Sequence, residues 1–209
     1  MIDLVVWFFI GLFCGALPWS VWITRRFVGR DAREIGDGNP GSANAWKLGG
    51  WIVGVLALVL DVLKGVVPVL LFLNLTGLGN STNFLYQLAI GMVIVSPIIG
   101  HGWTPFLKFN GGKALATTMG IWTAVSLALA LPLLCFFLIP LHVIQKNHSI
   151  TVTISFVGMA LFFFLVPHLV TIPTISLLVM TIMNFAIIVF KHRKEYLEGF
   201  LLRNWCKGD

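Results

Sequence analysis

The chain has 209 residues, of which 58% are hydrophobic and only 11% are charged, and its mean hydropathy is +0.94. Soluble domains carry roughly 25% charged residues, so a water-soluble fold of this size could not bury so much apolar surface. The net charge of +6 does not indicate nucleic-acid binding, because the basic residues lie at the ends of apolar runs. We therefore predict a single all-α integral membrane domain over residues 1–209.

Seven apolar segments are predicted as membrane-spanning helices, each near the length that a bilayer requires. The first segment has no basic residue before it and is followed by Arg25 and Arg26. It therefore does not have the pattern of a cleavable signal, and its N-terminus is expected outside. The fourth and fifth segments meet near Pro132. The predicted helices cover residues 3–24, 48–73, 84–100, 114–130, 132–145, 152–168 and 172–190.

Lys and Arg residues collect in every second connection between these segments. They occur in the connections 25–47, 101–113 and 145–151 and in the tail 191–209. The connections 74–83, 131–132 and 167–173 contain none. Because cytoplasmic loops are enriched in Lys and Arg, this alternation predicts an outside N-terminus and a cytoplasmic C-terminus.

The second apolar segment contains a charged pair, Asp61 and Lys64, one helical turn apart. Charges at this depth are costly unless they are paired or face a polar cavity. Two interpretations remain open at this point. The pair could join two helices structurally, or Lys64 could line a site for an anionic group.

The first basic connection, residues 33–47, alternates small residues with polar ones. Glycines let the backbone approach a ligand closely, and successive N–H groups in such turns form anion-binding nests. An ordinary polar turn is the alternative, although such turns need fewer glycines. The alternating pairs are Gly36/Asp37, Gly38/Asn39, Gly41/Ser42 and Ala43/Asn44.

Residues 111–113, Gly-Gly-Lys, lead directly into the fourth apolar segment. This arrangement places free N–H groups, the positive end of a helix dipole and an ammonium together, which suits phosphate. The loop is not a Walker A motif, because Leu107 and Ala114 occupy its required Gly and Ser/Thr positions. His101 begins the same loop.

The tail begins with a third basic cluster, Lys191-His-Arg-Lys-Glu195. Such a cluster beside a membrane also suits anionic lipid headgroups. In the predicted topology it lies on the same side as the other two polar loops. The three loops together therefore predict a polar site for a phosphate-bearing molecule at the cytoplasmic membrane face.

Together these motifs resemble those of the bacterial membrane glycerol-3-phosphate acyltransferases that take the acyl group from an acyl phosphate. The likeness covers almost the whole chain. The family pattern G-S-G-N-x-G-A-T-N-x-x-R is matched by Gly36, Gly38, Asn39, Gly41 and Asn44. Its G-H and G-G-K-G-x-A-T are matched by Gly100, His101, Gly111, Gly112, Lys113, Ala116 and Thr117. Its L-D-x-L-K-G-x-x-P is matched by Leu60, Asp61, Leu63, Lys64, Gly65 and Pro68, and its H-R-E-N by His192 and Arg193.

Several positions depart from the family pattern, and two departures introduce a carboxylate. Asp37 stands where the family has Ser, and Glu195 where it has Asn. An ionised carboxylate has no donor and repels phosphate, so we hypothesise a kept donor site and an altered acceptor site. If the acceptor is still glycerol 3-phosphate, Asp37 is expected to turn onto a hydroxyl or to pair with Arg33. The other departures are Ser42-Ala43 for Ala-Thr, Lys47 for Arg and Ala114 for Gly.

The resemblance implies acyl transfer from acyl phosphate to the primary hydroxyl of glycerol 3-phosphate, giving lysophosphatidic acid at the cytoplasmic face of the bacterial inner membrane. It implies no metal and no cofactor, and it suggests the soluble enzyme that makes acyl phosphate as a partner. The alternatives are a paralogue with an altered acceptor or no activity, a transporter of a phosphorylated solute, and a structural membrane subunit. The implied catalytic residues are His101, Lys113 and His192. The implied substrate-binding residues are Arg33, Asp37, Asn39, Ser42, Asn44, Lys47, Lys64, Gly111, Gly112, Thr117, Lys146 and Ser149.

Overall fold

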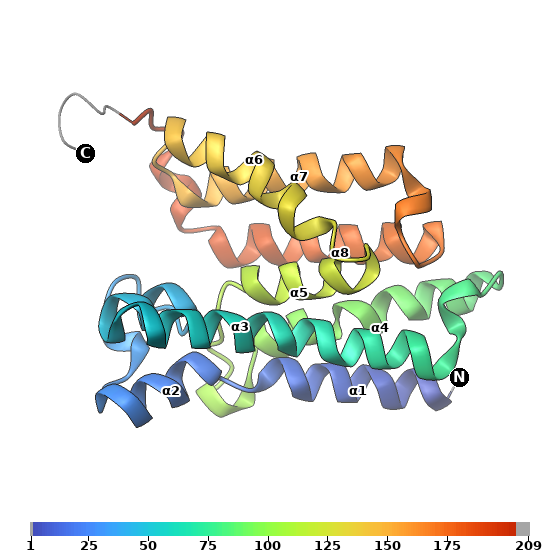
Figure 1. Cartoon of the computed structure of the whole chain (residues 1–209), viewed down its shortest axis with the longest axis horizontal. Coiled ribbons are helices and arrows are strands. Elements are labelled where there is room, and N and C mark those ends of the chain that lie inside the picture. The colour runs from blue at the N-terminus through green and yellow to red at the C-terminus, as the bar shows by residue number, and fades with distance from the viewer. Residues whose placement is uncertain (1, 204–209) are drawn as a thin grey trace.

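The computed structural model describes residues 2–203, and these fold into helices that run side by side (Figure 1). The last residues of the predicted tail, 204–209, lie outside this range. Short 3₁₀ turns occupy several connections: η1 Ala32–Glu34, η2 Leu78–Asn80, η3 Pro105–Leu107, η4 Pro167–Leu169 and η5 Glu195–Glu198. The α-helices are α1 Ile2–Ala16, α2 Trp19–Val28, α3 Ser42–Thr76, α4 Phe84–Gly102, α5 Leu115–Val125, α6 Ala130–Ile144, α7 His148–Leu165 and α8 Thr174–His192.

Within residues 2–203, five helical stretches are long and apolar enough to cross a membrane. They are Ile2–Val28, Ser42–Thr76, Phe84–Leu107, His148–Leu165 and Thr174–His192. The fourth and fifth predicted segments correspond to shorter apolar helices, α5 with 11 residues and α6 with 15. The all-helical architecture is confirmed, whereas the prediction of seven crossings goes beyond these five.

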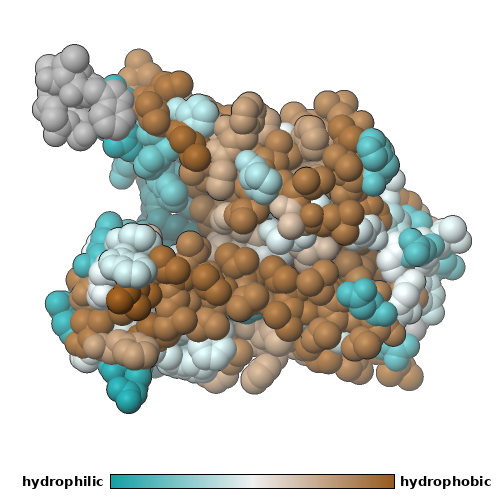
Figure 2. All heavy atoms as spheres, in the orientation of Figure 1, coloured by the Kyte–Doolittle hydropathy of each residue, from teal (hydrophilic) through white to brown (hydrophobic). Residues whose placement is uncertain are grey.

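Apolar side chains cover the middle of the helices, and hydrophilic ones gather toward the ends (Figure 2). Large apolar side chains such as Phe9, Trp51, Leu161 and Ile182 are more than half exposed. An exposed apolar surface of this extent is favourable only against another apolar phase. The surface therefore fits a lipid surrounding.

Glycines set the closest helix contacts. A Cβ at Gly15 of α1 would collide with the backbone of Pro97 in α4. Gly65 of α3 and Gly120 of α5 face each other in the same way, and a Cβ on either would meet the backbone of the opposite helix. Small residues at such crossings let membrane helices pack backbone to backbone. The α3–α5 crossing fixes the helix that begins just after Lys113.

The charged pair in α3 joins helices, as the structural interpretation predicts. Lys64 Nζ lies 2.9 Å from Asp61 Oδ1, and both side chains are buried. Lys64 also donates to the carbonyl of Leu17 at 3.0 Å, in the break between α1 and α2, where Pro18 has no N–H to continue a helix. Ser20 of α2 donates to the other oxygen of Asp61 at 3.1 Å. The pair thus ties α3 to the α1–α2 break.

Candidate active site

The polar loops meet at one end of the bundle, where the α2–α3 connection, the loop before α5, the start of α7 and the segment after α8 lie close together (Figure 1). Hydrophilic side chains gather around a hollow at this end (Figure 2). A cavity of about 140 Å³ opens here. Its polar lining includes Asn39, Ser42, His101, Lys113, His148 and His192.

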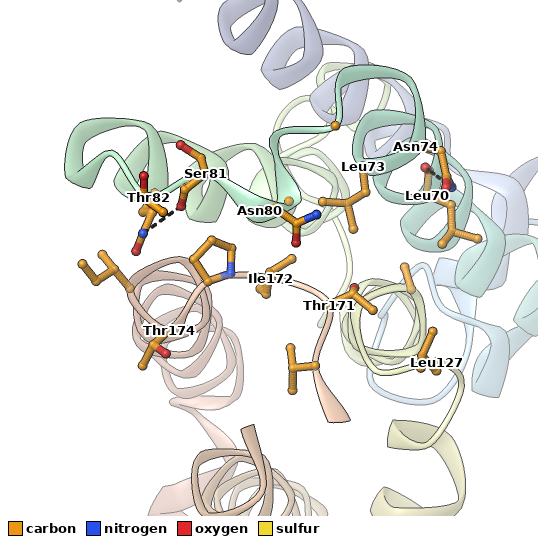
Figure 3. A pocket seen from close by; sticks show the side chains of 17 residues that line it. Leu70, Leu73, Asn74, Asn80, Ser81, Thr82, Leu127, Thr171, Ile172 and Thr174 are labelled. Carbon is orange, nitrogen blue, oxygen red and sulfur yellow. Dashed lines mark hydrogen bonds between the residues drawn. The ribbon is translucent and has the colours of Figure 1, made fainter. Parts of the chain in front are cut away.

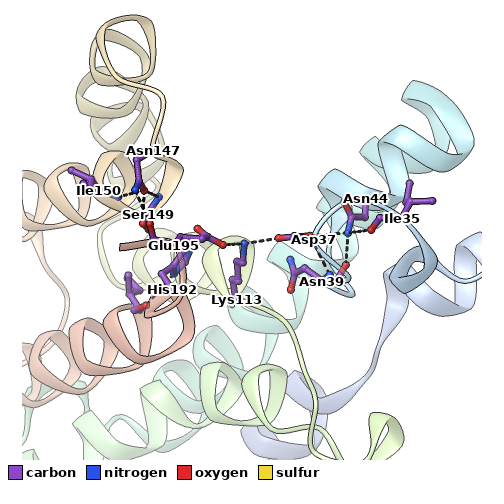
Figure 4. Close-up of polar contacts among 11 residues, drawn as sticks. Ile35, Asp37, Asn39, Asn44, Lys113, Asn147, Ser149, Ile150, His192 and Glu195 are labelled. Carbon is purple, nitrogen blue, oxygen red and sulfur yellow. Dashed lines mark hydrogen bonds and ion pairs between the residues drawn. The ribbon is translucent and has the colours of Figure 1, made fainter. Parts of the chain in front are cut away.

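Lys113 stands at the centre of the site, between two carboxylates from distant parts of the chain (Figure 4). Its Nζ lies 2.5 Å from Asp37 Oδ2 and also pairs with Glu195 Oε1. Burial lowers the pKa of Lys113, but the two carboxylates raise it more, and the result lies above the ordinary value. The ammonium is therefore fully charged at neutral pH, as phosphate binding requires.

The position of Asp37 is set by Asn44, which is buried at the start of α3. The Asn44 amide donates to Asp37 Oδ1 at 2.9 Å and to the carbonyls of Ile35 and Asn39 at 3.0 Å (Figure 4). Gly36 lies beside this amide with a φ of +60°, which a side chain would strain. Asn44, predicted as a ligand-binding residue, therefore acts on the site by organising the loop.

Asp37 is ionised in this arrangement. Burial raises the pKa of its carboxyl, but hydrogen bonds from Lys113, the Asn39 amide and Asn44 lower it more, to about 2. The expectation that Asp37 could pair with Arg33 is wrong. Arg33 Nη2 instead lies 2.8 Å from Asp31 Oδ2, which also holds Arg25 at 2.7 Å.

The glycines before Lys113 let their loop pack against the end of α4. The Gly112 amide donates to the carbonyl of His101 at 3.2 Å. A Cβ at Gly112 would collide with the His101 ring, and a Cβ at Gly111 would collide with the carbonyls of His101 and Gly102. The Gly112 N–H, predicted to bind phosphate, is thus engaged by the protein in this conformation. Lys113 is the group that the loop presents to the cavity.

Two predicted histidines line the cavity, and each has a buried ring nitrogen without a hydrogen-bond partner among residues 2–203. These nitrogens are His101 Nδ1 and His192 Nε2. Buried polar atoms in folded proteins nearly always have a partner, so these two nitrogens are available for a hydrogen bond from a ligand or an ordered water. Both histidines therefore stand where a substrate group could meet them.

His148 is a site residue that the sequence reasoning missed. It begins α7 and lines the cavity, and its ring centroid lies 6.2 Å from that of His192. Asn147 was also missed. Its buried side chain donates to the carbonyls of Glu195 at 2.7 Å and Gly199 at 3.0 Å, and so places η5. The only sequence signal for either was their place in a connection predicted on the same side as the other loops.

Several other predicted binding residues lie outside the cavity lining. Lys47 is exposed on α3, and Lys146 is exposed with its backbone N–H bonded to Leu201. Thr117 donates to the carbonyl of Asp61 at 3.2 Å, and Ser149 donates to Asn147 Oδ1 at 2.5 Å, so both hydroxyls hydrogen-bond within the protein. Across residues 2–203, no group of three or more His, Cys, Asp or Glu side chains is arranged to hold a metal ion.

A larger cavity, of about 880 Å³, lies at the opposite end of the bundle (Figure 3). It opens where the end of α3 meets the start of α8, and its lining includes Asn74, Asn80, Ser81, Thr171 and Thr174. None of its lining residues, all of which belong to the described part of the chain, carries a charge. Its chemistry does not suit a phosphate group.

Comparison with known proteins agrees with the motifs at the smaller cavity. Residues 5–199 match the family described as glycerol-3-phosphate acyltransferase. A relative of that name from Pseudoalteromonas translucida is 32% identical over 195 residues, covering 92% of this chain and 87% of the relative. Glycerol-3-phosphate acyltransferase 1 of Thermotoga maritima is 42% identical over 112 residues, and the match spans only 52% of its length. Matches to the relatives from Clostridium acetobutylicum and Syntrophotalea carbinolica likewise span 60% and 54% of those proteins.

The fold is also that of a solved structure. The crystal structure of PlsY (YgiH), an integral membrane glycerol 3-phosphate acyltransferase in its glycerol 3-phosphate form, superimposes with a TM-score of 0.79. The match covers 98% of this chain and 97% of that one at 24% sequence identity. The lysophosphatidic acid form of the same enzyme superimposes with a TM-score of 0.74 over 93% of this chain and 90% of that one.

Proposed function

The chain belongs to the glycerol-3-phosphate acyltransferase family, and from this premise we propose that it transfers an acyl group from an acyl phosphate to the primary hydroxyl of glycerol 3-phosphate. The product would be lysophosphatidic acid. The observation that carries the proposal is the position of Lys113, which stands where the family's polar loops meet, in one cavity with His192. The proposed enzyme is a single domain over residues 1–209.

Lys113 is proposed to bind the phosphate of the acyl phosphate, since its ammonium is the permanent cation in the cavity lining. Asn39 and Ser42 line the same cavity and offer donors and acceptors to glycerol 3-phosphate. The free Nε2 of His192 accepts a hydrogen bond from the attacking hydroxyl. His101 positions the loop before Lys113, because its backbone carbonyl accepts a hydrogen bond from the Gly112 amide.

The reaction then needs positioning more than covalent chemistry. The acceptor oxygen attacks the acyl carbonyl carbon, a carbon–oxygen bond forms, and the bond from that carbon to the phosphate oxygen breaks. Phosphate is a good leaving group, so the site needs no acyl-enzyme, metal or cofactor, and the hydroxyl proton leaves on the phosphate. Holding the two substrates together and balancing the phosphate charge supplies the rate enhancement.

The proposed topology has seven crossings, with the N-terminus outside and the site facing the cytoplasm of a bacterial inner membrane. It counts α5 and α6 as crossings, although α5 has only 11 residues. Non-helical backbone is tolerated at membrane depth where protein encloses it. Support for this comes from Ser126 at the break after α5, which is buried, donates to the carbonyl of Trp122 at 2.7 Å and accepts from the amide of Ala130 at 2.9 Å, whereas residues 127–129 are exposed. A soluble enzyme that makes acyl phosphate is the proposed partner.

The test is acyl transfer from palmitoyl phosphate to radiolabelled glycerol 3-phosphate by the purified protein in detergent. Wild type is expected to form lysophosphatidic acid, and Lys113→Ala is expected to form almost none. Lys194→Ala removes an exposed cation from the same tail and is expected to act like wild type. Equal activity in wild type and Lys113→Ala, or no product from folded wild type, would contradict the proposal.

A further inference from the structure

Lys191, the residue before His192 in α8, has no role in the proposed chemistry and does not line the cavity. Its side chain instead reaches the loop that precedes Lys113. We infer that Lys191 is a positioning residue, which holds the Gly111–Gly112 loop against the end of α4 and so fixes where Lys113 meets the phosphate of the donor. This role rests on the proposed function, because it concerns the donor site of that reaction.

The Lys191 ammonium joins three segments of the chain. Its Nζ donates to the carbonyl oxygen of Gly102, the last residue of α4, and to that of Gly111 in the loop, at 3.4 Å from the latter. An ammonium has three N–H donors, so it can serve both carbonyls at once. One side chain from α8 thus connects the end of α4 with the glycines that lead to Lys113.

An aromatic ring and a glycine fix the position of this ammonium. Lys191 Nζ lies 4.7 Å from the centroid of the Trp103 ring, and that ring packs 5.8 Å from the ring of Phe190 in α8. The face of an aromatic ring attracts a cation. A Cβ at Gly102 would lie 3.0 Å from Lys191 Cε, so the glycine leaves room for the lysine stem. The ammonium therefore has a defined place despite its long side chain.

Loss of the ammonium would release the loop and leave α8 in place. Among residues 2–203, one hydrogen bond, from the Gly112 N–H to the His101 carbonyl, would still join the two glycines to α4. In contrast, Asn184 holds α8 to α5, because its side chain accepts from Trp122 at 3.0 Å and donates to Thr118 at 2.9 Å. A change at Lys191 should therefore affect the donor loop more than the helix that carries His192.

The first experiment compares the Michaelis constants of wild type and Lys191→Met in the acyl-transfer assay. Methionine can still pack on Trp103 but has no donor. The KM for palmitoyl phosphate should rise about tenfold, the effect of losing one hydrogen bond from a charged group, whereas the KM for glycerol 3-phosphate should change less than about twofold. Lys191→Arg keeps donors and a cation that stacks on aromatic rings, and should recover most of the loss. Lys194→Met makes the same change at an exposed cation and should match wild type.

The second experiment needs no turnover. Hydrogen–deuterium exchange of the full chain in detergent reports local opening, and the Gly112 amide is hydrogen-bonded to His101. The peptide that contains Gly112 should exchange about tenfold faster in Lys191→Met than in wild type or Lys194→Met. Peptides around Asn184 in α8 should exchange alike in all proteins, because the contacts of Asn184 with α5 are unchanged.

Equal loop exchange in wild type and Lys191→Met would overturn the positioning role of Lys191. Equal rises in the two Michaelis constants would also overturn it, because they indicate a general loss of structure rather than a displaced donor loop. If folded wild type forms no product, the proposed function is contradicted, and the exchange of the loop alone then decides whether Lys191 holds it.

Discussion

His192 Nδ1 lies 3.0 Å from the carbonyl oxygen of Ile188, one turn earlier in α8. A carbonyl oxygen can only accept a hydrogen bond, so this contact assigns the ring proton to Nδ1. Nε2 then presents a lone pair, and it is the nitrogen that is buried without a partner among residues 2–203. The helix that carries His192 thus also selects the tautomer suited to a hydroxyl.

His192→Ala is therefore expected to lower the acyl-transfer rate about 100-fold, because the attacking hydroxyl loses the hydrogen-bond acceptor that orients it. The measurement is kcat with palmitoyl phosphate and glycerol 3-phosphate. His168→Ala, which removes an exposed histidine from η4, is the control and should retain full activity. Equal loss of activity in the two variants would contradict a direct role of His192 in the reaction.

The Asp61–Lys64 pair predicts a stability effect rather than a catalytic one. Lys64→Met leaves a buried carboxylate that, within residues 2–203, has only Ser20 as a side-chain donor, and the free energy of unfolding should fall by about 3–5 kcal/mol. Adding Asp61→Leu removes that unpaired charge and should restore much of the loss. Denaturant unfolding in detergent measures both variants. A double variant as unstable as Lys64→Met would mean that the lost stability comes from the missing ion pair and not from the unpaired buried charge of Asp61.

Ala114 has a φ of +63° at the residue before α5, where the related family has glycine. The left-handed conformation costs a non-glycine residue about 1–2 kcal/mol, while glycine adds about 0.4–1 kcal/mol of unfolded-chain entropy. Ala114→Gly should therefore stabilise the fold slightly, by roughly 0.5–1 kcal/mol. The thermal midpoint in detergent measures it, with Ala116→Gly within α5 as a control expected to destabilise. A lower midpoint for Ala114→Gly would show that the strain is absent.

Gly120 predicts a packing effect at the α3–α5 crossing. A side chain there would collide with the carbonyl of Val62, so Gly120→Val should separate the helices and shift Lys113. We expect loss of both the folded yield and acyl transfer. Gly77→Asn is the control, because Gly77 ends α3 with a φ of +62° in open space and asparagine tolerates that conformation. Folding of Gly120→Val with normal activity would contradict the close crossing.

The pKa of Asp37 predicts the pH range over which its carboxylate stabilises the fold. Its pKa of about 2 lies below the ordinary 3.8, so it stabilises the fold at every pH above the ordinary value. That contribution is lost as the pH falls from about 4 to about 2. The difference in unfolding free energy between wild type and Asp37→Asn should therefore be constant from about pH 5 to pH 9 and shrink below about pH 4. A difference that changes near neutral pH would mean that Asp37 titrates there.

Much of the architecture was predictable from the sequence because apolar run length and charge placement are local properties. The long helices lie close to their predicted ranges, and the Asp61–Lys64 pair forms across one turn as its spacing indicates. The α5–α6 region was harder to predict from the sequence, because apolar composition alone cannot show that protein rather than lipid encloses a short helix. The break at Ser126 depends on packing that the sequence pattern does not record.

At the site, the sequence by itself determined the residue types: a Gly-Gly-Lys loop before a helix, a Gly- and Asn-rich connection, and a histidine at the start of a basic tail. Those groups are sufficient to indicate a phosphate chemistry. Only the tertiary structure decided their partners. Lys113 lies 76 residues from Asp37 and 82 from Glu195, and Arg33, the nearer cation to Asp37, is held by Asp31 instead. An ion pair depends on distance in space, and that distance is set by how α3, α5 and α8 pack.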